Sequence, residues 1–326
     1  MNIAIIGCEH SHASAYVEAA KRLPNLKIVG LAEPNKELGA AFADKYSLDY
    51  YESYQELIDN PEVSVVCICT ANVRHCQLTI AAAKAKKHVI VEKPIATTLE
   101  DGEKMIEACR ENGVKLMVAL PCRYIPAIAR AKEVIEEGKL GEIVAITGTN
   151  HGTMPGGWFV QKELSGGGAI IDHTIHVADL IHWFIKADIK TVFAKGGTHY
   201  HSIPTEDTGL LFMTFDNGTY GTLDTSWNRP EAYPTWGDVT MEIVGTKGSL
   251  WVDSFKQHGD IYSNKYNKSL DSYWGDDMNY LMIKDFVEAI EEDRPSPIPG
   301  EAGLFALEVA LMAYEAIDKG VPTQKE

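Results

Sequence analysis

The first 120 residues alternate between short apolar runs and longer amphipathic stretches, and this alternation limits the possible folds more than any other feature of the chain. The apolar runs predict strands, and the stretches between them predict helices. The predicted strands are Asn2–Ile6, Leu26–Ala32, Val63–Thr70, His88–Val91 and Val114–Ala119. The predicted helices are Ser14–Leu23, Asn35–Tyr46, Tyr54–Ile58, His75–Ala85 and Leu99–Asn112. This order predicts a doubly wound parallel sheet, which binds ligands at the carboxyl ends of its strands.

Beyond Pro121 the pattern changes to strands separated by turn signals such as Asp216-Asn217-Gly218. We expect helices at Ala127–Glu137, Met278–Glu292 and Ala302–Lys319. The predicted strands are Ile143–Thr149, Thr191–Lys195, Thr208–Phe215, Thr219–Trp227, Thr240–Val244 and Gly248–Val252. They predict an α/β region with an open, largely antiparallel sheet and helices on one face. We therefore expect two domains, residues 1–121 and residues 122–326, with the final helices free to pack back on the first.

The chain carries a formal net charge of −16, which argues against a nucleic acid or an anionic membrane as its partner. No apolar run approaches the roughly 18 residues that a membrane-spanning helix needs. The 6 cysteines all lie in the first 122 residues without a zinc-ribbon spacing. Buried free thiols in a reducing cytoplasm are the expected state. We expect a cytoplasmic protein that acts on a small molecule.

The loop after the first strand is where a dinucleotide-binding fold carries the pattern G-x-G-x-x-G. Gly7 supplies the first glycine, but Glu9 replaces the second and His12 the third. The amides of this loop, including those of His10 and Ser11, can still meet a pyrophosphate at the start of the next helix. A carboxylate at Glu9 would repel a phosphate unless the side chain turns away.

Glu33 closes the second predicted strand, where an acidic side chain can accept hydrogen bonds from the adenosine ribose hydroxyls. A 2′-phosphate would meet this carboxylate. At about 4 Å and an effective dielectric near 20, each unit-charge pair costs up to about 4 kcal/mol. Glu33 therefore favours NAD over NADP. The alternative is that Glu33 is an ordinary solvated loop residue.

Asp172 and His176 follow the glycine run Gly166-Gly167-Gly168 and are spaced so that, on a helix, both lie on one face. Lys93 follows the strand His88–Val91 far upstream. A lysine at the carboxyl end of a strand, together with an Asp/His helix, indicates a dehydrogenase site. The alternatives are a structural role for the histidine and a surface position for the lysine.

The chemistry of alcohol oxidation gives these three residues distinct roles. A base must accept the hydroxyl proton, and imidazole has a pKa near the operating pH, so we expect His176 to be the base. Lys93 can stabilise the developing alkoxide with its charge, and Asp172 can hold a neighbouring hydroxyl or orient the imidazole.

Weaker candidates for the substrate pocket are Tyr124, His151, Trp158, His173 and Trp236. Trp158 lies in a glycine-containing loop that could stack on a sugar, although packing is the alternative. Asp179 and His182 are expected to stabilise their helix or its packing. The histidine pairs His10/His12 and His173/His176 lack recognisable third and fourth ligands, so no metal is predicted.

Several segments, in a fixed order, carry a resemblance to a known family. They are Thr70-Ala71-Asn72 with His75, Lys87 to Ala96 with Glu92-Lys93-Pro94 at its centre, Arg123-Tyr124 with Pro126, Gly138-Lys139-Leu140-Gly141, and Gly166-Gly167-Gly168 with Asp172, His176 and Asp179. Over almost its whole length the chain resembles the Gfo/Idh/MocA oxidoreductases, which include glucose–fructose oxidoreductase and inositol 2-dehydrogenase. There are two departures: Thr174 stands where the family has a glycine, and His173 adds an imidazole.

The resemblance implies an N-terminal Rossmann domain and a C-terminal α/β domain whose open sheet forms an oligomer interface, hence a homo-dimer or homo-tetramer. It also implies that Lys93 touches substrate and cofactor, and that Asp172 and His176 form the family's Asp-x-x-x-His pair. The residues expected at the cofactor are Gly7, Glu9, His10, Ser11, His12, Glu33, Thr70, Ala71, Asn72, His75, Glu92 and Lys93.

The sequence thus predicts an NAD-dependent dehydrogenase that acts on a sugar, a sugar derivative or inositol. One alternative is an enzyme with tightly bound NAD that uses transient oxidation for elimination or glycoside cleavage. Another is a non-catalytic NAD-binding sensor. Intact Lys93, Asp172 and His176 argue against the sensor, whereas the altered glycine loop supports it.

Overall fold

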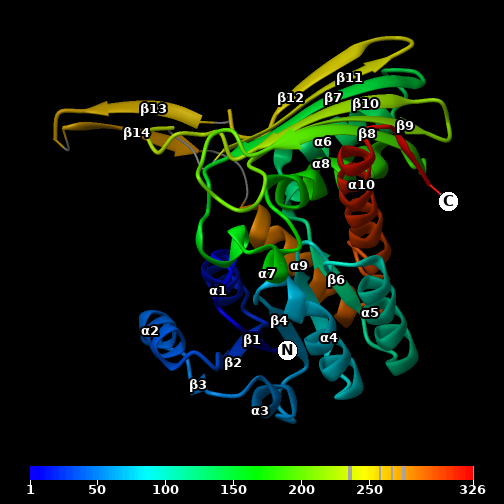
Figure 1. The fold of residues 1–326 in the computed structure, drawn as a ribbon. Helices are drawn as coiled ribbons and strands as arrows, with labels where there is room; N and C mark the ends of the chain where they lie inside the picture. Colours follow the sequence, from blue (N-terminus) through cyan, green and yellow to red (C-terminus); the bar gives the residue numbers. More distant parts are fainter. Residues whose placement is uncertain (234–236, 257, 266, 274–276, 326) are drawn as a thin grey trace.

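Two β-sheets organise the molecule, one formed by residues 2–119 and the other by residues 143–324 (Figure 1). The computed structural model describes residues 1–326 except 234–236, 257, 266, 274–276 and 326. The first sheet is wholly parallel and the second is largely antiparallel. The predicted fold class is confirmed. The predicted boundary between residues 121 and 122 falls within the 3₁₀ helix η2 (Pro121–Tyr124) and stays a prediction.

The first sheet has the strand order β3-β2-β1-β4-β5-β6, as expected for a doubly wound fold. Its strands are β1 (Asn2–Ile6), β2 (Lys27–Ala32), β3 (Tyr50–Tyr51), β4 (Val65–Ile68), β5 (His88–Glu92) and β6 (Leu116–Ala119). The connecting helices are α1 (His12–Arg22), α2 (Lys36–Tyr46), α3 (Tyr54–Ile58), η1 (Asn72–Arg74), α4 (His75–Lys84) and α5 (Leu99–Asn112). Every residue of β4 and β6 is buried, because helices cover both faces.

Local signals in the sequence explain where these helices begin and end. The Asn35 side chain accepts a hydrogen bond from the Leu38 amide at the start of α2, and Thr98 does the same for Asp101 at the start of α5. Gly113 ends α5 with a φ of 67°, a conformation that glycine adopts without strain. The predicted bounds of these helices therefore differ little from the observed ones.

The second sheet has the order β12-β11-β7-β10-β9-β8-β15, in which only the β7–β10 pair is parallel. Its strands are β7 (Ile143–Gly152), β8 (Ile189–Gly197), β9 (Thr208–Phe215), β10 (Tyr220–Ser226), β11 (Gly237–Gly245), β12 (Ser249–Asp253) and β15 (Thr323–Gln324). A hairpin of β13 (His258–Ser263) and β14 (Lys268–Tyr273) extends away from the sheet (Figure 1). The hairpin is a feature that the sequence analysis did not predict.

The helices of the second region connect the two sheets. They are α6 (Pro126–Glu136), η3 (Gly157–Val160), α7 (Lys162–Ser165), α8 (Ala169–Ile185), α9 (Met278–Glu291) and α10 (Gly300–Lys319). Helix α8 lies against one face of the second sheet and packs on α10. Helix α9 packs on α1, and α10 reaches α5 and β6, so both final helices contact the first region.

The first turn of α8 is fixed from outside the helix. Glu206 Oε1 accepts hydrogen bonds from the amides of Gly168 at 2.8 Å and Ile170 at 3.0 Å. The Tyr314 hydroxyl donates to the same oxygen at 2.7 Å. A Cβ atom at Gly167 would collide with that hydroxyl, and one at Gly168 would collide with the Glu206 carbonyl. The glycine run before α8 is therefore required by close packing, and it sets the position of Asp172 and His176.

All 6 cysteines are free, and only Cys76 is not fully buried. This confirms the expectation of buried thiols, while the cytoplasmic location stays a prediction. Within the described parts of the chain, no helix combines the length and apolar character needed to span a membrane.

Candidate active site

Loops from the carboxyl ends of β1, β2, β4 and β5 meet at one edge of the first sheet. The Cys8 amide donates to Glu33 Oε2 at 3.2 Å, which joins the first loop to the second. The His10 amide donates to the Cys69 carbonyl at 3.1 Å, which joins it to the loop after β4. Glu92 ends β5, and Lys93 follows it. The predicted cofactor residues therefore converge on one edge, as the parallel topology requires.

The glycine loop keeps the features that a pyrophosphate needs, although only its first glycine remains. Gly7 has a φ of +82°, and a Cβ atom there would collide with Thr70 Cγ2. The amides of Glu9 and Ser11 have no hydrogen-bond partner among the described residues. They lie at the N-terminus of α1, where the helix dipole favours an anion. This arrangement fits a dinucleotide.

Three of the predicted cofactor residues are engaged inside the protein. Glu33 is 2% exposed and accepts hydrogen bonds from the amides of Cys8 and Asn35, and burial raises the pKa of its carboxyl group. The Asn72 side chain donates to the Ser165 carbonyl at 2.8 Å. His75 is fully buried, with Nδ1 2.9 Å from the Pro94 carbonyl oxygen. Asn72 and His75 therefore hold the loops together, and direct contact of these residues with a cofactor stays a prediction.

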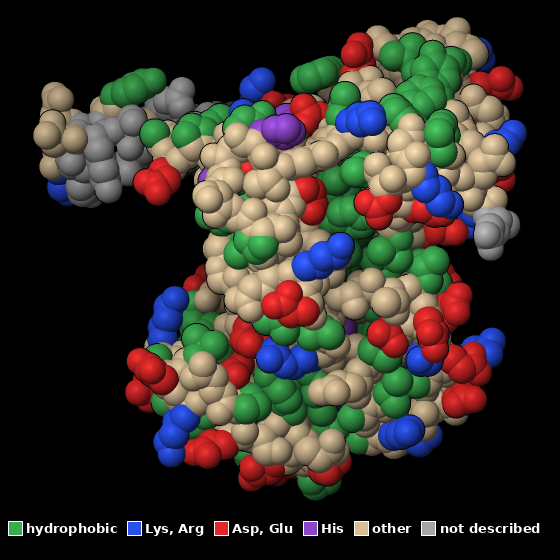
Figure 2. All heavy atoms as spheres, in the orientation of Figure 1, with side chains coloured by type: hydrophobic (Ala, Val, Ile, Leu, Met, Phe, Trp, Pro, Cys, Tyr) green, Lys and Arg blue, Asp and Glu red, His purple; other side chains and the backbone are tan. Residues whose placement is uncertain are grey.

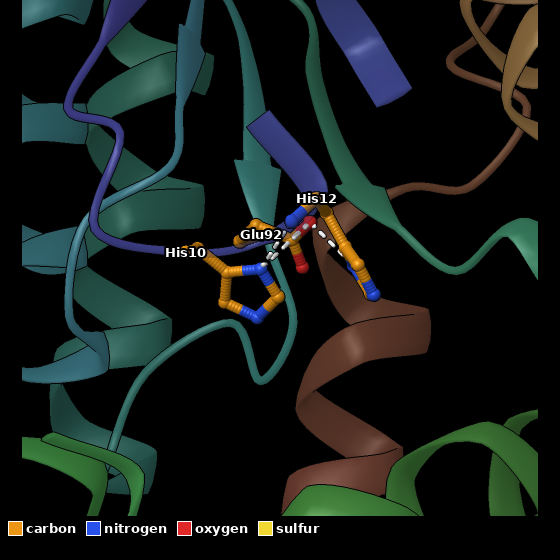
Figure 3. A group of neighbouring side chains, drawn as sticks. All are labelled: His10, His12 and Glu92. Carbon is orange, nitrogen blue, oxygen red and sulfur yellow. Dashed lines mark hydrogen bonds and ion pairs between the residues drawn. The ribbon is translucent and has the colours of Figure 1, made fainter. Parts of the chain in front are cut away.

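His10, His12 and Glu92 form a cluster in which the two imidazoles face one carboxylate (Figure 3). Glu92 Oε1 lies 2.9 Å from His12 Nδ1 and 3.8 Å from His10 Nδ1. Burial alone would raise the pKa of Glu92, but the imidazoles and the Lys93 charge hold it well below its ordinary value. Burial lowers the pKa of His10 to about 3, so this imidazole is neutral.

These three residues are also the one group in the described chain whose side chains could together ligate a metal. Their facing atoms already take part in hydrogen bonds, because His10 Nδ1 accepts from the His12 amide at 3.2 Å and Glu92 accepts from His12 Nδ1. The expectation of a metal-free site stays a prediction.

Lys93 and Asp172 form a buried ion pair between the two regions of the molecule. Lys93 Nζ donates to Asp172 Oδ1 at 2.5 Å, and the two side chains are 3% and 9% exposed. Trp227 Nε1 donates to the other carboxylate oxygen at 3.0 Å. Although burial raises the pKa of Asp172, the adjacent Lys93, His173 and Trp227 hold it well below its ordinary value. The carboxylate is therefore charged and held in one orientation.

His176 lies one helical turn after Asp172 and lines a cavity of about 270 Å³. The cavity is bounded by the starts of α1 and α9, η2, α8, and the strands β7 and β11, and its lining includes Ser11, His12, Cys122, Asn150, Val239 and Asn279. His176 Nδ1 is 3.7 Å from Cys122 Sγ. Burial and the Lys93 charge lower the pKa of His176 well below its ordinary value. The imidazole is therefore neutral at neutral pH and keeps one unprotonated ring nitrogen, although the same shift makes it a weaker base than an ordinary histidine.

The structure places Tyr124, His151, Trp158 and His173 outside the lining of this cavity. Tyr124 donates its hydroxyl to Asp285 at 2.7 Å. His151 lies between Asp224 and Asp238. Trp158 donates to the Glu9 carbonyl at 3.2 Å and stacks on Phe159, so it covers the glycine loop. His173 is buried, with Nδ1 3.0 Å from the Asn150 carbonyl oxygen. Trp236 lies outside the described residues.

Several residues of the site were not predicted from the sequence. Cys122 and Asn150 line the cavity, and Trp227 holds Asp172. Cys122 directly precedes the Arg123-Tyr124 motif, and this adjacency could have identified it as a site residue. Trp227 ends a predicted strand, but nothing in its sequence position identifies a partner 55 residues away. By contrast, Asp179 pairs with Arg123 at 2.5 Å, in agreement with the stabilising role expected for it.

The fold and this cavity define a dinucleotide-dependent oxidoreductase. Residues 1–120 match the family model described as an oxidoreductase family with an NAD-binding Rossmann fold. Residues 128–251 match the model of the Gfo/Idh/MocA C-terminal domain. The chain belongs to the Gfo/Idh/MocA oxidoreductase family, and its first region is an NAD-binding Rossmann fold. The resemblance and the predicted cofactor are confirmed.

Relatives with assigned activities span most of the chain. Levoglucosan dehydrogenase from Pseudarthrobacter phenanthrenivorans is 31% identical over 77% of this chain and 73% of its own length. Myo-inositol 2-dehydrogenase from Thermotoga maritima is 26% identical over 98% of this chain and 97% of its own. A solved structure of levoglucosan dehydrogenase in complex with NADH and L-sorbose superposes with a TM-score of 0.85 and 26% identity, covering 99% of this chain and 98% of that one.

Proposed function

We propose that this protein is an NAD-dependent dehydrogenase that transfers a hydride between nicotinamide and a hydroxyl-bearing carbon of a sugar, a sugar derivative or inositol. The observation that carries the proposal is the buried Lys93–Asp172 ion pair one helical turn from His176, which lines a cavity beside the dinucleotide-binding edge together with Ser11 and His12. The named activities of the relatives, on levoglucosan and myo-inositol, support the substrate class.

His176 is the proposed general base. For its Nε2 to accept the hydroxyl proton, its Nδ1 must carry a proton and donate it toward Cys122 Sγ. Burial raises the pKa of Cys122 to about 12, so the thiol is neutral and does not compete for the proton. The low pKa of His176 keeps the imidazole unprotonated before each turnover.

Lys93 is proposed to stabilise the developing alkoxide. Asp172 fixes the Lys93 amino group through Oδ1, and Trp227 fixes Asp172 through Oδ2, so the donor is oriented before the substrate arrives. In oxidation the hydroxyl proton passes to His176 and the hydride leaves the same carbon. Bound NAD would supply the hydride acceptor at nicotinamide C4.

The polar atoms of the cavity suit a substrate with several hydroxyl groups. Asn150 donates through Nδ2 to the Asp238 carbonyl, whereas its buried Oδ1 has no partner. A buried acceptor without a partner is costly unless a ligand donates to it. Asn279 and Ser11 provide further polar side chains in the lining. A polyol hydroxyl that donates to Asn150 would satisfy the buried oxygen.

We also propose that the protein is a homo-oligomer that associates through the face of the second sheet opposite α8. This face carries exposed large apolar side chains, including Leu210 at 56% and Phe212 at 43%. Tyr220 lies beside Phe212 with ring centroids 6.3 Å apart. Figure 2 shows hydrophobic side chains gathered over the strands of this sheet, at the upper right. Exposed apolar patches of this kind mark protein interfaces, and sedimentation velocity tests the oligomer.

The test of the proposed reaction is the formation of NADH with a panel of inositols, aldoses and anhydrosugars. Net NADH formation with at least one polyol is expected. Product without net NADH would replace this proposal with transient oxidation by tightly bound NAD. Binding of NAD without turnover of any compound would replace it with a sensor. Each outcome is distinguished by following NADH absorbance and product chromatography in the same reaction.

A further inference from the structure

Glu9 places a carboxylate where the dinucleotide-binding loop ordinarily has its second glycine. In the structure this carboxylate is turned toward the loop after β4. There Oε2 accepts a hydrogen bond from the Ala71 amide at 3.1 Å and pairs with the Arg74 guanidinium. The Glu9 and Arg74 side chains are 22% and 33% exposed, so solvent screens the pair only in part. The repulsive group is therefore turned away from the loop amides and paired with a positive charge.

Arg74 is well placed to hold this contact. It ends η1, and its amide donates to the Ala71 carbonyl at 3.0 Å. The positive charge of Arg74 also acts on the Glu33 carboxylate, which follows β2. Burial raises the pKa of Glu33, whereas the positive charge of Arg74 opposes this increase. One guanidinium thus acts on two of the acidic residues at the dinucleotide-binding edge, Glu9 and Glu33.

We propose that Arg74 is a positioning residue for the cofactor. The Arg74 guanidinium draws the Glu9 carboxylate away from the free amides of Glu9 and Ser11 and neutralises its charge, so that a pyrophosphate can bind. The inference rests on NAD binding, which the family establishes, and not on the proposed substrate. It explains how a loop with one of its three glycines still accepts a dinucleotide. Arg74 acts through Glu9 and needs no contact with the cofactor.

The test is a double-mutant cycle on NAD affinity, measured by calorimetry on the full-length protein without substrate. Arg74→Gln exposes the Glu9 charge to the pyrophosphate and is expected to weaken NAD binding about tenfold. Glu9→Gln is expected to bind NAD at least as tightly as the unmodified protein. The double variant is expected to return to within about threefold of the unmodified protein, because the repulsive charge is gone.

Two further measurements separate this role from a structural one. ADP carries a pyrophosphate and should lose affinity for Arg74→Gln as NAD does, whereas adenosine should not. Added salt should strengthen NAD binding by Arg74→Gln, because it screens a repulsion, and should not do so for the double variant. Arg74→Lys keeps the charge and serves as the matched control.

Three results would overturn the inference. The first is unchanged NAD affinity in Arg74→Gln. The second is equal weakness in Arg74→Gln and the double variant, which would mean that Arg74 contacts the cofactor itself or only builds the loop. The third is an equal loss of adenosine binding. Failure to find a polyol substrate would leave these binding results unaffected, so the two proposals are tested separately.

Discussion

Two clusters of histidine and aspartate lie on opposite sides of the second sheet, and their surroundings drive the two histidines to opposite charge states. On the α8 side, burial and the Lys93 charge lower the pKa of His176. On the open side, His151 has Asp238 at 2.9 Å from Nδ1 and Asp224 at 3.2 Å from Nε2. Burial lowers the pKa of His151, but the two carboxylates outweigh it and raise the pKa to about 9.

The difference shows that the neighbours of a histidine, and not its type, decide whether it can act as a base. His176 is neutral beside a cation and has access to a cavity, so it can accept a proton. His151 is already protonated, and its Nδ1 faces a carboxylate that also pairs with Arg229. The first cluster is suited to catalysis and the second to holding β7, β10 and β11 together.

Removal of the neutral imidazole should have the largest effect. His176→Ala is expected to lower kcat on a polyol by about 10²–10⁴-fold and to leave NAD affinity nearly unchanged. Steady-state kinetics and calorimetry measure the two quantities. His151→Gln is the matched control and should retain turnover, because this side chain lies outside the cavity lining. Parallel losses of cofactor affinity and thermal stability in His176→Ala would assign that imidazole to the architecture.

Removal of one partner of the buried Lys93–Asp172 ion pair should have the second-largest effect. Asp172→Asn leaves the Lys93 ammonium group buried without its carboxylate, and the expected loss of unfolding free energy is about 3–5 kcal/mol. Asp224→Asn on the open side provides the control. Its side chain is 48% exposed in the single chain, so the loss of unfolding free energy for the monomer should be below about 1 kcal/mol. Urea unfolding measures both, and equal losses would contradict the distinction between the two clusters.

The two histidines should also give opposite responses of stability to pH. The folded-state pKa of His151, about 9, exceeds the ordinary value of 6.5. Its stabilising effect is therefore complete below about pH 6.5 and is lost as the pH rises through about 9. The effect is at most about 3 kcal/mol. The difference in unfolding free energy between the unmodified protein and His151→Gln should shrink over this window, and a constant difference would refute the assignment.

For His176 the sign reverses, because its folded-state pKa lies below the ordinary value. As the pH falls below about 6.5, the unfolded chain takes up a proton that the folded protein does not, and stability declines. The decline should be smaller in the His176→Ala variant but not absent, because His10 and His173, whose pKa values are also lowered by burial, still contribute to it. The same unfolding series, extended to acidic pH, measures it.

Loss of the indole donor to Asp172 should have the smallest effect. Trp227→Phe removes a hydrogen bond of 3.0 Å to a charged oxygen, which typically contributes about 1.5 kcal/mol or somewhat more. We expect a loss of stability of this size with a modest fall in kcat. Trp251→Phe, at a side chain in a residue 61% exposed, should change neither. A full loss of turnover in Trp227→Phe would give the indole a larger role than orientation.

The sequence predicted the elements whose signal is periodic and local. The strand and helix bounds of the first region follow from burial on both faces and from caps such as Asn35, Thr98 and Gly113. The placement of Asp172 and His176 on one helix face followed from helix geometry, whereas the joint site of Lys93 with Asp172 was implied by the family resemblance. The hairpin β13–β14 was missed because it lies away from any core, so its strands carry no strong apolar alternation.

The rest depends on contacts between residues that are distant in sequence. Arg74 turns the Glu9 carboxylate, Trp227 holds Asp172, and Glu206 fixes the start of α8. None of these partners is encoded by spacing or composition. The sequence was also insufficient to assign His151. Strand alternation places the His151 side chain on the opposite face of β7 from Asn150, but the sequence alone does not say which of the two faces borders the cavity.

The central claim is that Lys93, Asp172 and His176 act on one carbon, and a crystal structure of the Lys93→Met variant with NAD and a polyol tests it most directly. The account predicts one hydroxyl within hydrogen-bond distance of His176 Nε2, on a carbon that faces nicotinamide C4, with the substituted side chain at position 93 pointing at the same oxygen. A polyol bound elsewhere, or a reacting hydroxyl out of reach of His176, would contradict it.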